Sequence, residues 1–201
     1  MRSAPGQCVD GRAAPANEEG PPDGELLARF TSAGDQRAFE ALVRRHQGSV
    51  FNFCLRLLGQ PEDAADVVQD TFVQLYSHLG RLDVAEPLAP WLFRVARNRC
   101  IDVLRRRRTI GLDDDEPEEP IADEPLPDEV AERADLQHLL AEAIQHLPPT
   151  YAEVVALRYA ADRTFGEIAV IIGCDEGAAR VRFHRAKALL RGWLRARLED
   201  A

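Results

Sequence analysis

The sequence predicts an all-α fold of two small helical domains joined by a flexible acidic linker, of which the C-terminal one is a helix-turn-helix. Three observations predict it. Apolar residues recur at helical spacings of three and four, without the alternation typical of strands. A stretch rich in acids and prolines, residues 109–130, separates two such regions. Residues 164–198 then combine a short capped helix, a glycine turn and a long basic helix.

Composition limits the class of protein. No apolar run among the 201 residues approaches the roughly 20 residues of a membrane span, so we expect a cytoplasmic protein with no membrane insertion. The net charge of −9 argues against nucleic-acid binding, but acids and arginines are concentrated in different segments, and this asymmetry is informative. The four cysteines lack a metal-ligand spacing and are interpreted as reduced, buried thiols, and the alternative is a redox or metal role for Cys54, Cys100 or His46. We expect no metal and no cofactor.

The predicted domain boundaries follow shifts in composition. The N-terminal stretch is rich in proline, glycine, alanine and charge without an apolar period, and the linker holds ten acids, four prolines and no basic residue. The linker is either a plain spacer or a segment whose charge imitates nucleic acid and lies in a basic channel. The predicted parts are a disordered extension at residues 1–23, a helical domain at 24–108, the linker at 109–130 and a second helical domain at 131–198.

An acidic helix is predicted at residues 61–79 of the first domain. Its apolar residues share one face, and Asp66, Gln69 and Asp70 lie outside that face. Acidic residues near a helix start are favourable to the helix dipole, so a structural role accounts for them. The alternative is a docking surface for a basic partner.

A basic helix is predicted at residues 91–108, after a loop at 80–89 and a proline that opens the helix. It holds seven arginines and one aspartate, and the side chains expected to turn outward include Arg94, Arg97, Asn98 and Arg105. Basic residues at a helix end complement the dipole, but so many arginines favour nucleic acid. Trp91 is either a surface on which a base can stack or a core residue.

The second domain is predicted to begin with two helices. The first ends at residue 147, before two prolines that cannot continue it. Thr150, followed three residues later by Glu153, predicts a capping box, in which each side chain satisfies a free backbone N–H group at the helix start.

Local signals at residues 164–175 predict the start and the turn of the helix-turn-helix. Thr164 and Glu167 form a second capping box pattern. Gly173 can end the short helix in a left-handed conformation, and Asp175 can cap the next helix.

The long helix after this turn has an apolar stripe and an opposite basic face. Arg180, His184 and Arg185 lie on the basic face, with Gly177 and Val181 near its middle. A helix of this width fits the major groove of DNA, where arginine can bind phosphates or guanine edges. The alternative is a solvated basic face without a ligand.

Signatures of catalysis are absent from the sequence. It contains no glycine-rich phosphate loop, no nucleophile elbow and no zinc-protease signature. Asp66 and Asp70 lie four residues apart and could share a proton, but this spacing is common among solvated acids. We therefore expect a protein that is not an enzyme.

Together, these segments resemble the extracytoplasmic-function (ECF) sigma factors of the sigma-70 family. Residues 66–72 (DVVQDTF), 91–98 (WLFRVARN) and 101–102 (ID) resemble region 2 of that family. The segments that resemble region 4 are residues 147–149 (LPP), 157–159 (LRY), 165–169 (FGEIA) and 182–186 (RFHRA). The resemblance extends over residues 24–198.

The resemblance implies a bacterial transcription initiation factor that binds core RNA polymerase, directs it to promoter DNA and helps to open the duplex. By this resemblance Asp66, Gln69 and Asp70 bind the clamp coiled coil of the largest polymerase subunit. The residues implied in minus-10 binding are Trp91, Arg94, Arg97, Asn98 and Arg105. Those implied in minus-35 binding are Arg180, Arg182, His184 and Arg185. The linker is implied to run toward the active-site and RNA-exit channels.

Two exposed basic faces on a two-domain chain also suggest that an anti-sigma factor covers them. The alternative function is a stand-alone helix-turn-helix transcriptional regulator that binds duplex DNA without polymerase. A purely protein-binding regulator is a third possibility.

Overall fold

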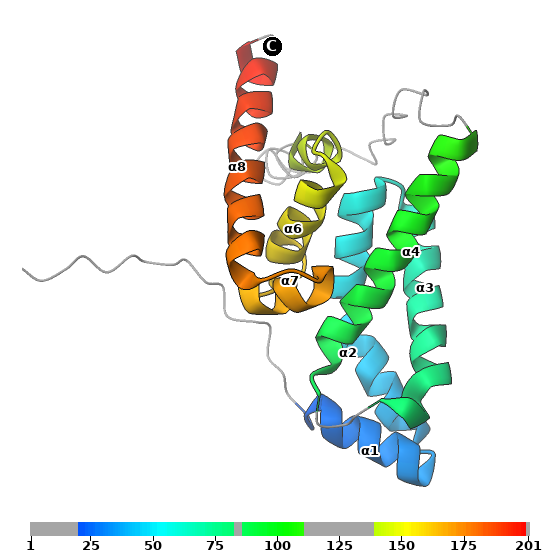
Figure 1. The fold of residues 1–201 in the computed structure, drawn as a ribbon. Coiled ribbons are helices and arrows are strands. Elements are labelled where there is room, and N and C mark those ends of the chain that lie inside the picture. The colour runs from blue at the N-terminus through cyan, green and yellow to red at the C-terminus, as the bar shows by residue number, and fades with distance from the viewer. Residues whose placement is uncertain (1–19, 83–85, 111–138, 200–201) are drawn as a thin grey trace, which may run out of the picture.

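The computed structural model describes residues 20–82, 86–110 and 139–199, and the regular elements in these ranges are all helical, which confirms the predicted all-α class. The helices are α1 (Asp23–Ala33), α2 (Gln36–Leu58), α3 (Pro61–His78), α4 (Leu88–Ile110), α6 (Pro149–Tyr159), α7 (Phe165–Ile172) and α8 (Glu176–Glu199), with a 3-10 turn at Leu79–Arg81 and a further helical stretch at 139–145 (Figure 1). No helix in the described ranges has the length and apolar character needed to cross a membrane. Most of the predicted extension and linker lies outside these ranges.

Helices α1 to α4 form the N-terminal unit, and local signals set several of their ends. Gly34 and Gly59 end α1 and α2 at φ values of 64° and 75°, in the left-handed region that favours glycine. Asp35 accepts a hydrogen bond from the backbone N–H of Arg37 and so caps α2. Pro61 opens α3, where its missing N–H group leaves no hydrogen bond unmade.

The first helix begins at Asp23, a residue that the sequence assigned to the extension. Its carboxylate accepts a hydrogen bond from Arg45 at 2.6 Å and lies 2.7 Å from Nε2 of His46. Burial disfavours the charged acid, but the hydrogen bonds and charges of His46 and Arg45 outweigh burial and lower the pKa of Asp23. These partners lie 22 and 23 residues further along the chain, so composition could not reveal them.

Helix α4 begins at Leu88, three residues before the predicted start at Trp91. Pro90 therefore lies within the first turn, where proline is tolerated because these N–H groups have no partner in the helix. Leu88 and Ala89 are buried. Tertiary packing thus extends the helix into part of the segment that was expected to be a loop.

In the C-terminal unit, residues 139–199, α7 and α8 form the predicted helix-turn-helix. Thr164 accepts a hydrogen bond from the backbone N–H of Glu167, whose carboxylate accepts one from the N–H of Thr164, so this capping box is confirmed. Gly173 ends α7 at a φ of 73°. Asp175 then accepts a hydrogen bond from the N–H of Ala178 at 2.7 Å and caps α8, as predicted.

The predicted capping box of Thr150 and Glu153 is wrong. Helix α6 begins earlier, at Pro149, a residue type favoured at the first helical position, and no side chain caps its start. Thr150 therefore lies inside the helix. The carboxylate of Glu153 is buried and instead binds Arg97 of α4 at 2.6 Å.

The two units pack directly against each other, which the sequence did not predict. Figure 1 shows α7 between α8 and the helices α2 and α4, and α2 also contacts α6. Buried apolar residues form one cluster that continues through both units. Within it Phe53 of α2 and Phe93 of α4 are fully buried, with ring centroids 5.5 Å apart and the rings nearly perpendicular.

Candidate nucleic-acid and partner interfaces

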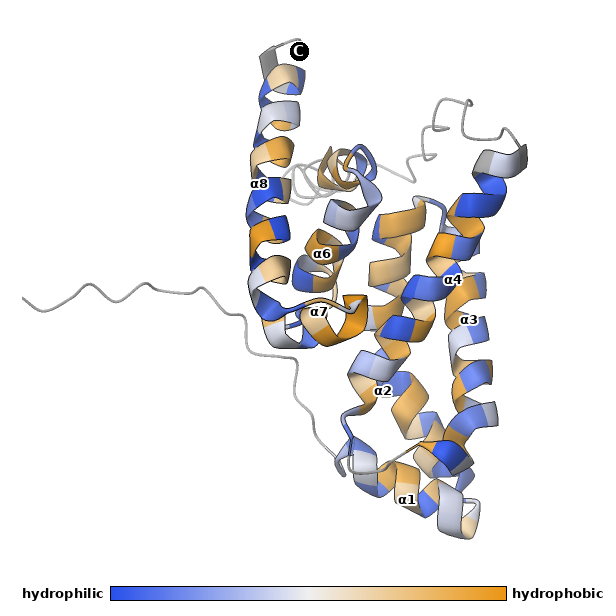
Figure 2. Cartoon of the chain, viewed as in Figure 1, coloured by the Kyte–Doolittle hydropathy of each residue, from blue (hydrophilic) through white to orange (hydrophobic). Residues whose placement is uncertain are grey.

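The outer face of α8 is basic and open to solvent. The apolar stripe that holds this helix against the unit is buried and consists of Ala179, Phe183, Ala186 and Leu190. Arg180, His184 and Arg185 are exposed, and Figure 2 shows hydrophilic residues recurring along the helix. This arrangement leaves a helical face free for a groove of matching width.

Neighbouring side chains hold Arg180 in place. Its Nη2 donates to Glu176 at 2.6 Å, and its guanidinium lies 4.7 Å from the centroid of the Phe165 ring. Arg182 is only partly exposed, because it lies nearer to the buried stripe than Arg185 does. Arg180, His184 and Arg185 therefore share the open face of α8, whereas Arg182 lies at its margin and is less accessible to a ligand.

The capping box stabilises the start of α7, the helix that precedes α8 in the helix-turn-helix. Glu167 accepts hydrogen bonds from the N–H and the hydroxyl of Thr164 at 2.8 and 2.7 Å and from Arg163 at 3.1 Å. Burial raises the pKa of Glu167, but these donors and the charge of Arg163 outweigh burial, so the pKa lies below its ordinary value. The cap is therefore charged and complete at neutral pH.

The three residues predicted on the outer face of α3 lie in solvent. Asp66, Gln69 and Asp70 are exposed, and Asp70 lies 3.9 Å from Arg99 of α4. These side chains line a polar hollow of about 590 Å³ between α3 and α4, together with acids and arginines of both helices. A partner that binds here meets charges of both signs.

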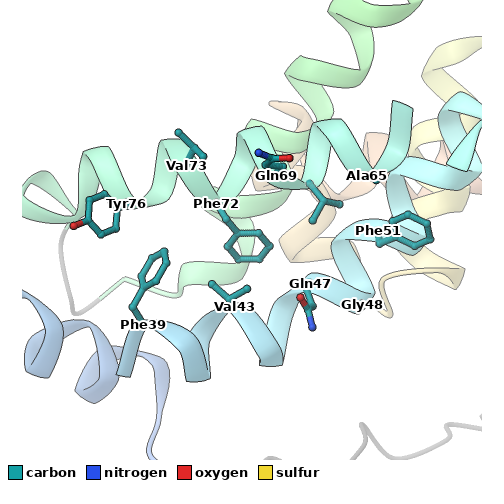
Figure 3. Close-up of a pocket in the computed structure, with 11 residues that line it drawn as sticks. Phe39, Val43, Gln47, Gly48, Phe51, Ala65, Gln69, Phe72, Val73 and Tyr76 are labelled. Atoms are coloured by element: carbon teal, nitrogen blue, oxygen red, sulfur yellow. The ribbon is translucent and has the colours of Figure 1, made fainter. Parts of the chain in front are cut away.

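An apolar groove beside this surface was not predicted from the sequence. It has a volume of about 720 Å³, and the residues that line it from α2 and α3 include Phe39, Val43, Phe51, Phe72, Val73 and Tyr76 (Figure 3). Gln69 lines both the groove and the polar hollow. Val73 and Tyr76 are 59% and 57% exposed, and their position outside the apolar stripe of α3 is the sequence signal that could have revealed the groove.

Three of the five residues predicted in α4, Trp91, Asn98 and Arg105, keep side-chain surface that a ligand can reach. Asn98 and Arg105 are exposed and about two helical turns apart, roughly 10 Å along the axis. Trp91 is half-buried and packs against the core, with its ring centroid 6.1 Å from that of His78. This packing supports the core role of Trp91, and base stacking on its remaining surface stays a prediction.

The other two residues of α4 contact the C-terminal unit. Arg94 is exposed, but its Nη2 donates to the backbone carbonyl of Val170 at 3.0 Å. Arg97, which was expected to face solvent, has only 22% of its side chain exposed and donates from Nε to Glu153. Helical periodicity could not show this, because the covering unit comes from a distant part of the chain.

The thiols lie apart from these surfaces. Cys54 and Cys100 are free and fully buried in the N-terminal unit, whereas Cys174 is partly exposed and Cys8 lies outside the described residues. A hydrogen bond with Cys54 and burial both raise the pKa of Cys100 above its usual range. In the part of the chain that the structure describes, no cluster of three or more His, Cys, Asp or Glu side chains could hold a metal ion.

Two family models match the chain. The model described as Sigma-70 region 2 covers residues 42–110, which include α3 and α4. The model described as Sigma-70, region 4 covers residues 137–190, which include α6, α7 and most of α8. The chain belongs to the ECF sigma factors of the sigma-70 family. The N-terminal unit is thus the region 2 unit of this sigma factor, and the C-terminal unit is its region 4 unit.

Other sigma factors are similar to this one over most of their length. The ECF RNA polymerase sigma factor SigW of Bacillus subtilis is 29% identical over 171 residues, which cover 81% of this chain and 91% of SigW. The RNA polymerase sigma factor CnrH of Cupriavidus metallidurans is 36% identical over 85% of this chain and 94% of its own.

Solved structures of sigma factors share the fold. CnrH in complex with the cytosolic domain of CnrY matches with a TM-score of 0.68 at 30% identity, over 87% of this chain and 97% of that one. The sigma factor RpoE of Bartonella quintana, in complex with the anti-sigma factor NepR, matches with a TM-score of 0.64 at 25% identity, over 79% and 98% of the two chains.

Membership of this family decides the class of function. This ECF sigma factor is a promoter-specific transcription initiation factor, and sigma factors are non-catalytic transcription factors. The match to region 2 favours this function over a stand-alone helix-turn-helix regulator, because such a regulator would not account for residues 42–110.

Proposed function

We propose that this sigma factor binds core RNA polymerase through α3, recognises and melts the minus-10 element with α4, and reads the minus-35 element with α8. It acts in the cytoplasm and contributes binding rather than catalysis. The observation that supports the proposal most is the presence of both matched regions in one chain, each with a charged face on the helix to which the family resemblance assigns the task.

The proposed polymerase surface combines charge with apolar area. Asp66 and Asp70 attract a basic helix, such as one helix of the polymerase clamp coiled coil. Gln69 lies between these acids and the groove. The same helix can place apolar side chains against Val73 and Tyr76, which are already exposed. Exposed aromatic area at the centre of a polar rim is typical of protein interfaces.

The proposed minus-10 surface follows one side of α4. Arg94, Arg97 and Asn98 lie within two turns, and Arg105 extends the surface toward the end of the helix. Guanidinium groups bind phosphates, and the asparagine amide can pair with a base edge. Flipping a base out of the stack costs roughly a few kcal/mol, which stacking on Trp91 and nearby positive charge can offset.

The proposed minus-35 surface is the outer face of α8. Arg180 is oriented by Glu176 and Phe165, and Arg185 lies further along the exposed face. Both can reach guanine edges in a major groove, with His184 beside them. Arg182, which is partly buried, contributes from the margin of this surface.

An anti-sigma factor is the proposed regulatory partner. RpoE, whose structure resembles this chain, was solved in complex with the anti-sigma factor NepR. The apolar groove between α2 and α3 is a surface that such a partner could cover while it blocks the polymerase surface beside Gln69.

Run-off transcription on fragmented genomic DNA, with purified core polymerase, tests the proposal. We expect new start sites that depend on this protein and share two upstream elements. Asp66→Ala should weaken binding to core polymerase, and Glu62→Ala on the same helix is its control. Asn98→Ala and Arg185→Ala should leave core binding intact and lower transcription about tenfold or more, since a base contact contributes about 1–3 kcal/mol. Arg195→Ala, an exposed residue near the end of α8, is the control for Arg185. The absence of protein-dependent starts would contradict the proposal.

A further inference from the structure

Arg94 and Arg97 of the proposed minus-10 surface contact region 4, and each donates a hydrogen bond to an electronegative group there. Nε of Arg97 donates to the carboxylate of Glu153 at 2.6 Å, and Nη2 of Arg94 donates to the carbonyl of Val170 at 3.0 Å. Val170 lies in the last turn of α7, where carbonyls lack helical partners and the dipole attracts a cation. Region 4 thus offers α4 a carboxylate and a helix C-terminus, and both suit a cationic surface.

Burial gives the ion pair between Arg97 and Glu153 its importance. The side chain of Glu153 is 7% exposed, and that of Arg97 is 22% exposed. A carboxylate in such a place has lost most of its hydration, so it requires a partner. Glu153 is the one acidic side chain among the buried residues of the described ranges. It is not used to cap α6, and Arg97 is the donor that satisfies it.

The contacts around this pair form a packed interface. Arg163, just before α7, lies 5.2 Å from the centroid of the buried Phe93 ring of α4 and also binds Glu167 of the capping box. The apolar cluster continues from the helices of region 2 into those of region 4. The pair is therefore part of a continuous interface, unlike an isolated surface ion pair, which contributes little.

We infer that region 4 of this chain competes with promoter DNA for the α4 surface. In the arrangement that the structure shows, which is the closed one, the carboxylate of Glu153 accepts a hydrogen bond from the guanidinium of Arg97. Nucleic acid would bind the same guanidinium, because carboxylate and phosphate oxygens accept from the same donors. Helix α4 binds promoter DNA once α6 and α7 have moved away. Polymerase and DNA then favour the open form by binding it better than the closed one. This competition rests on the proposed minus-10 role of Arg97. The packing of region 4 against α4, which we call the closure, does not rest on that role.

The variant Glu153→Gln tests the closure in the full chain. It keeps the size of the side chain and removes its charge, so the closed form loses its buried ion pair. Small-angle X-ray scattering of the free protein should show a larger radius of gyration, and hydrogen–deuterium exchange should become faster in α6 and α7. Asp162→Asn is the matched control, since it removes an exposed carboxylate from region 4 and asparagine tolerates the φ of 49° at this position.

Variants of Arg97 test the same pair from the other side. Arg97→Gln should open the chain as Glu153→Gln does. Arg97→Glu and Glu153→Arg should each open it, and the double variant should recover the compact form by restoring the pair with its charges exchanged. Unchanged scattering and exchange in both glutamine variants would overturn the closure.

Run-off transcription separates the closure from the minus-10 role. Glu153→Gln should reach half-maximal transcription at a concentration about fivefold lower than wild type, the lower end of typical coupling between sites. An unchanged half-maximal concentration in an opened variant would overturn the competition. Arg97→Gln should be open but should lose promoter-dependent transcription. If it were open and as active as Glu153→Gln, the closure would stand and the minus-10 role of Arg97 would fail.

Discussion

Gly173, the turn residue of the helix-turn-helix, allows a substitution whose cost follows from the backbone alone. Its φ of 73° and ψ of 48° are left-handed, and a Cβ atom placed there meets no atom within 4 Å. Gly173→Ala therefore adds conformational energy without a clash. The left-handed conformation costs alanine about 1–2 kcal/mol, and the reduced freedom of the unfolded chain offsets about 0.4–1 kcal/mol of this. The expected net loss is about 1 kcal/mol, which corresponds to roughly 2–4 °C in Tm for a chain of this size.

Gly192 provides the matched control. It lies inside α8 without a positive φ, and its Cβ atom would also meet no atom within 4 Å. Alanine is favoured over glycine in a helix interior by about 1 kcal/mol, so Gly192→Ala should raise the free energy of unfolding. Urea denaturation followed by circular dichroism measures both variants. A Gly173→Ala chain as stable as wild type, or a shift of both variants in the same direction, would refute the backbone argument.

Three further perturbations address the core, the capping box and the thiols. Phe93→Ala removes a fully buried ring and should lower the free energy of unfolding in urea by about 3–5 kcal/mol. The pKa of Glu167 lies below its ordinary value of 4.5, so its stabilisation is complete above that pH and is lost as the pH falls through the folded-state pKa. The stability difference between wild type and Glu167→Gln, measured by urea denaturation, should therefore be constant above about pH 5 and narrow as the pH falls below it. Cys54 and Cys100 should resist alkylation by iodoacetamide until the chain unfolds, whereas Cys174 should react, as peptide mass mapping would show.

The same measurements can contradict each of these three predictions. Phe93→Leu keeps most of the volume and should cost less than alanine, so equal costs would show that ring volume does not stabilise the site. A stability difference for Glu167→Gln that stays constant with pH would show that the carboxylate is not bound in its charged form. Alkylation of Cys100 at the rate of Cys174 would show that the region 2 core opens without unfolding.

The helix-turn-helix was predictable because its determinants act over a few residues. Thr164, Glu167, Gly173 and Asp175 contact backbone groups within four positions of themselves, so spacing alone predicts their roles. The buried stripe of α8 follows in the same way from one period on one helix. The structure confirms each of these predictions.

Helix α4 was predicted less well because it is packed on several sides. The outward face expected from its sequence placed Arg97 in solvent, whereas only 22% of its side chain is exposed. Helices α2 and α3 cover part of α4, and α7 covers another part. A pattern with one buried face cannot describe a helix in this position, and only the fold of the whole chain reveals which residues α7 covers.

The two Thr-x-x-Glu segments show what decides between a local and a tertiary role. At the start of α7, Thr164 is the residue before the first helical one, so its glutamate can reach the free N–H groups. At the start of α6, Pro149 takes the first helical position, and Glu153 becomes the fifth residue, beyond those groups. A cap at an exposed helix start contributes about 1 kcal/mol, whereas a buried carboxylate left without its partner costs about 3–5 kcal/mol. The bond to Arg97 therefore prevails, and the residue that the sequence assigns to a local cap is the one that closes region 4 onto α4.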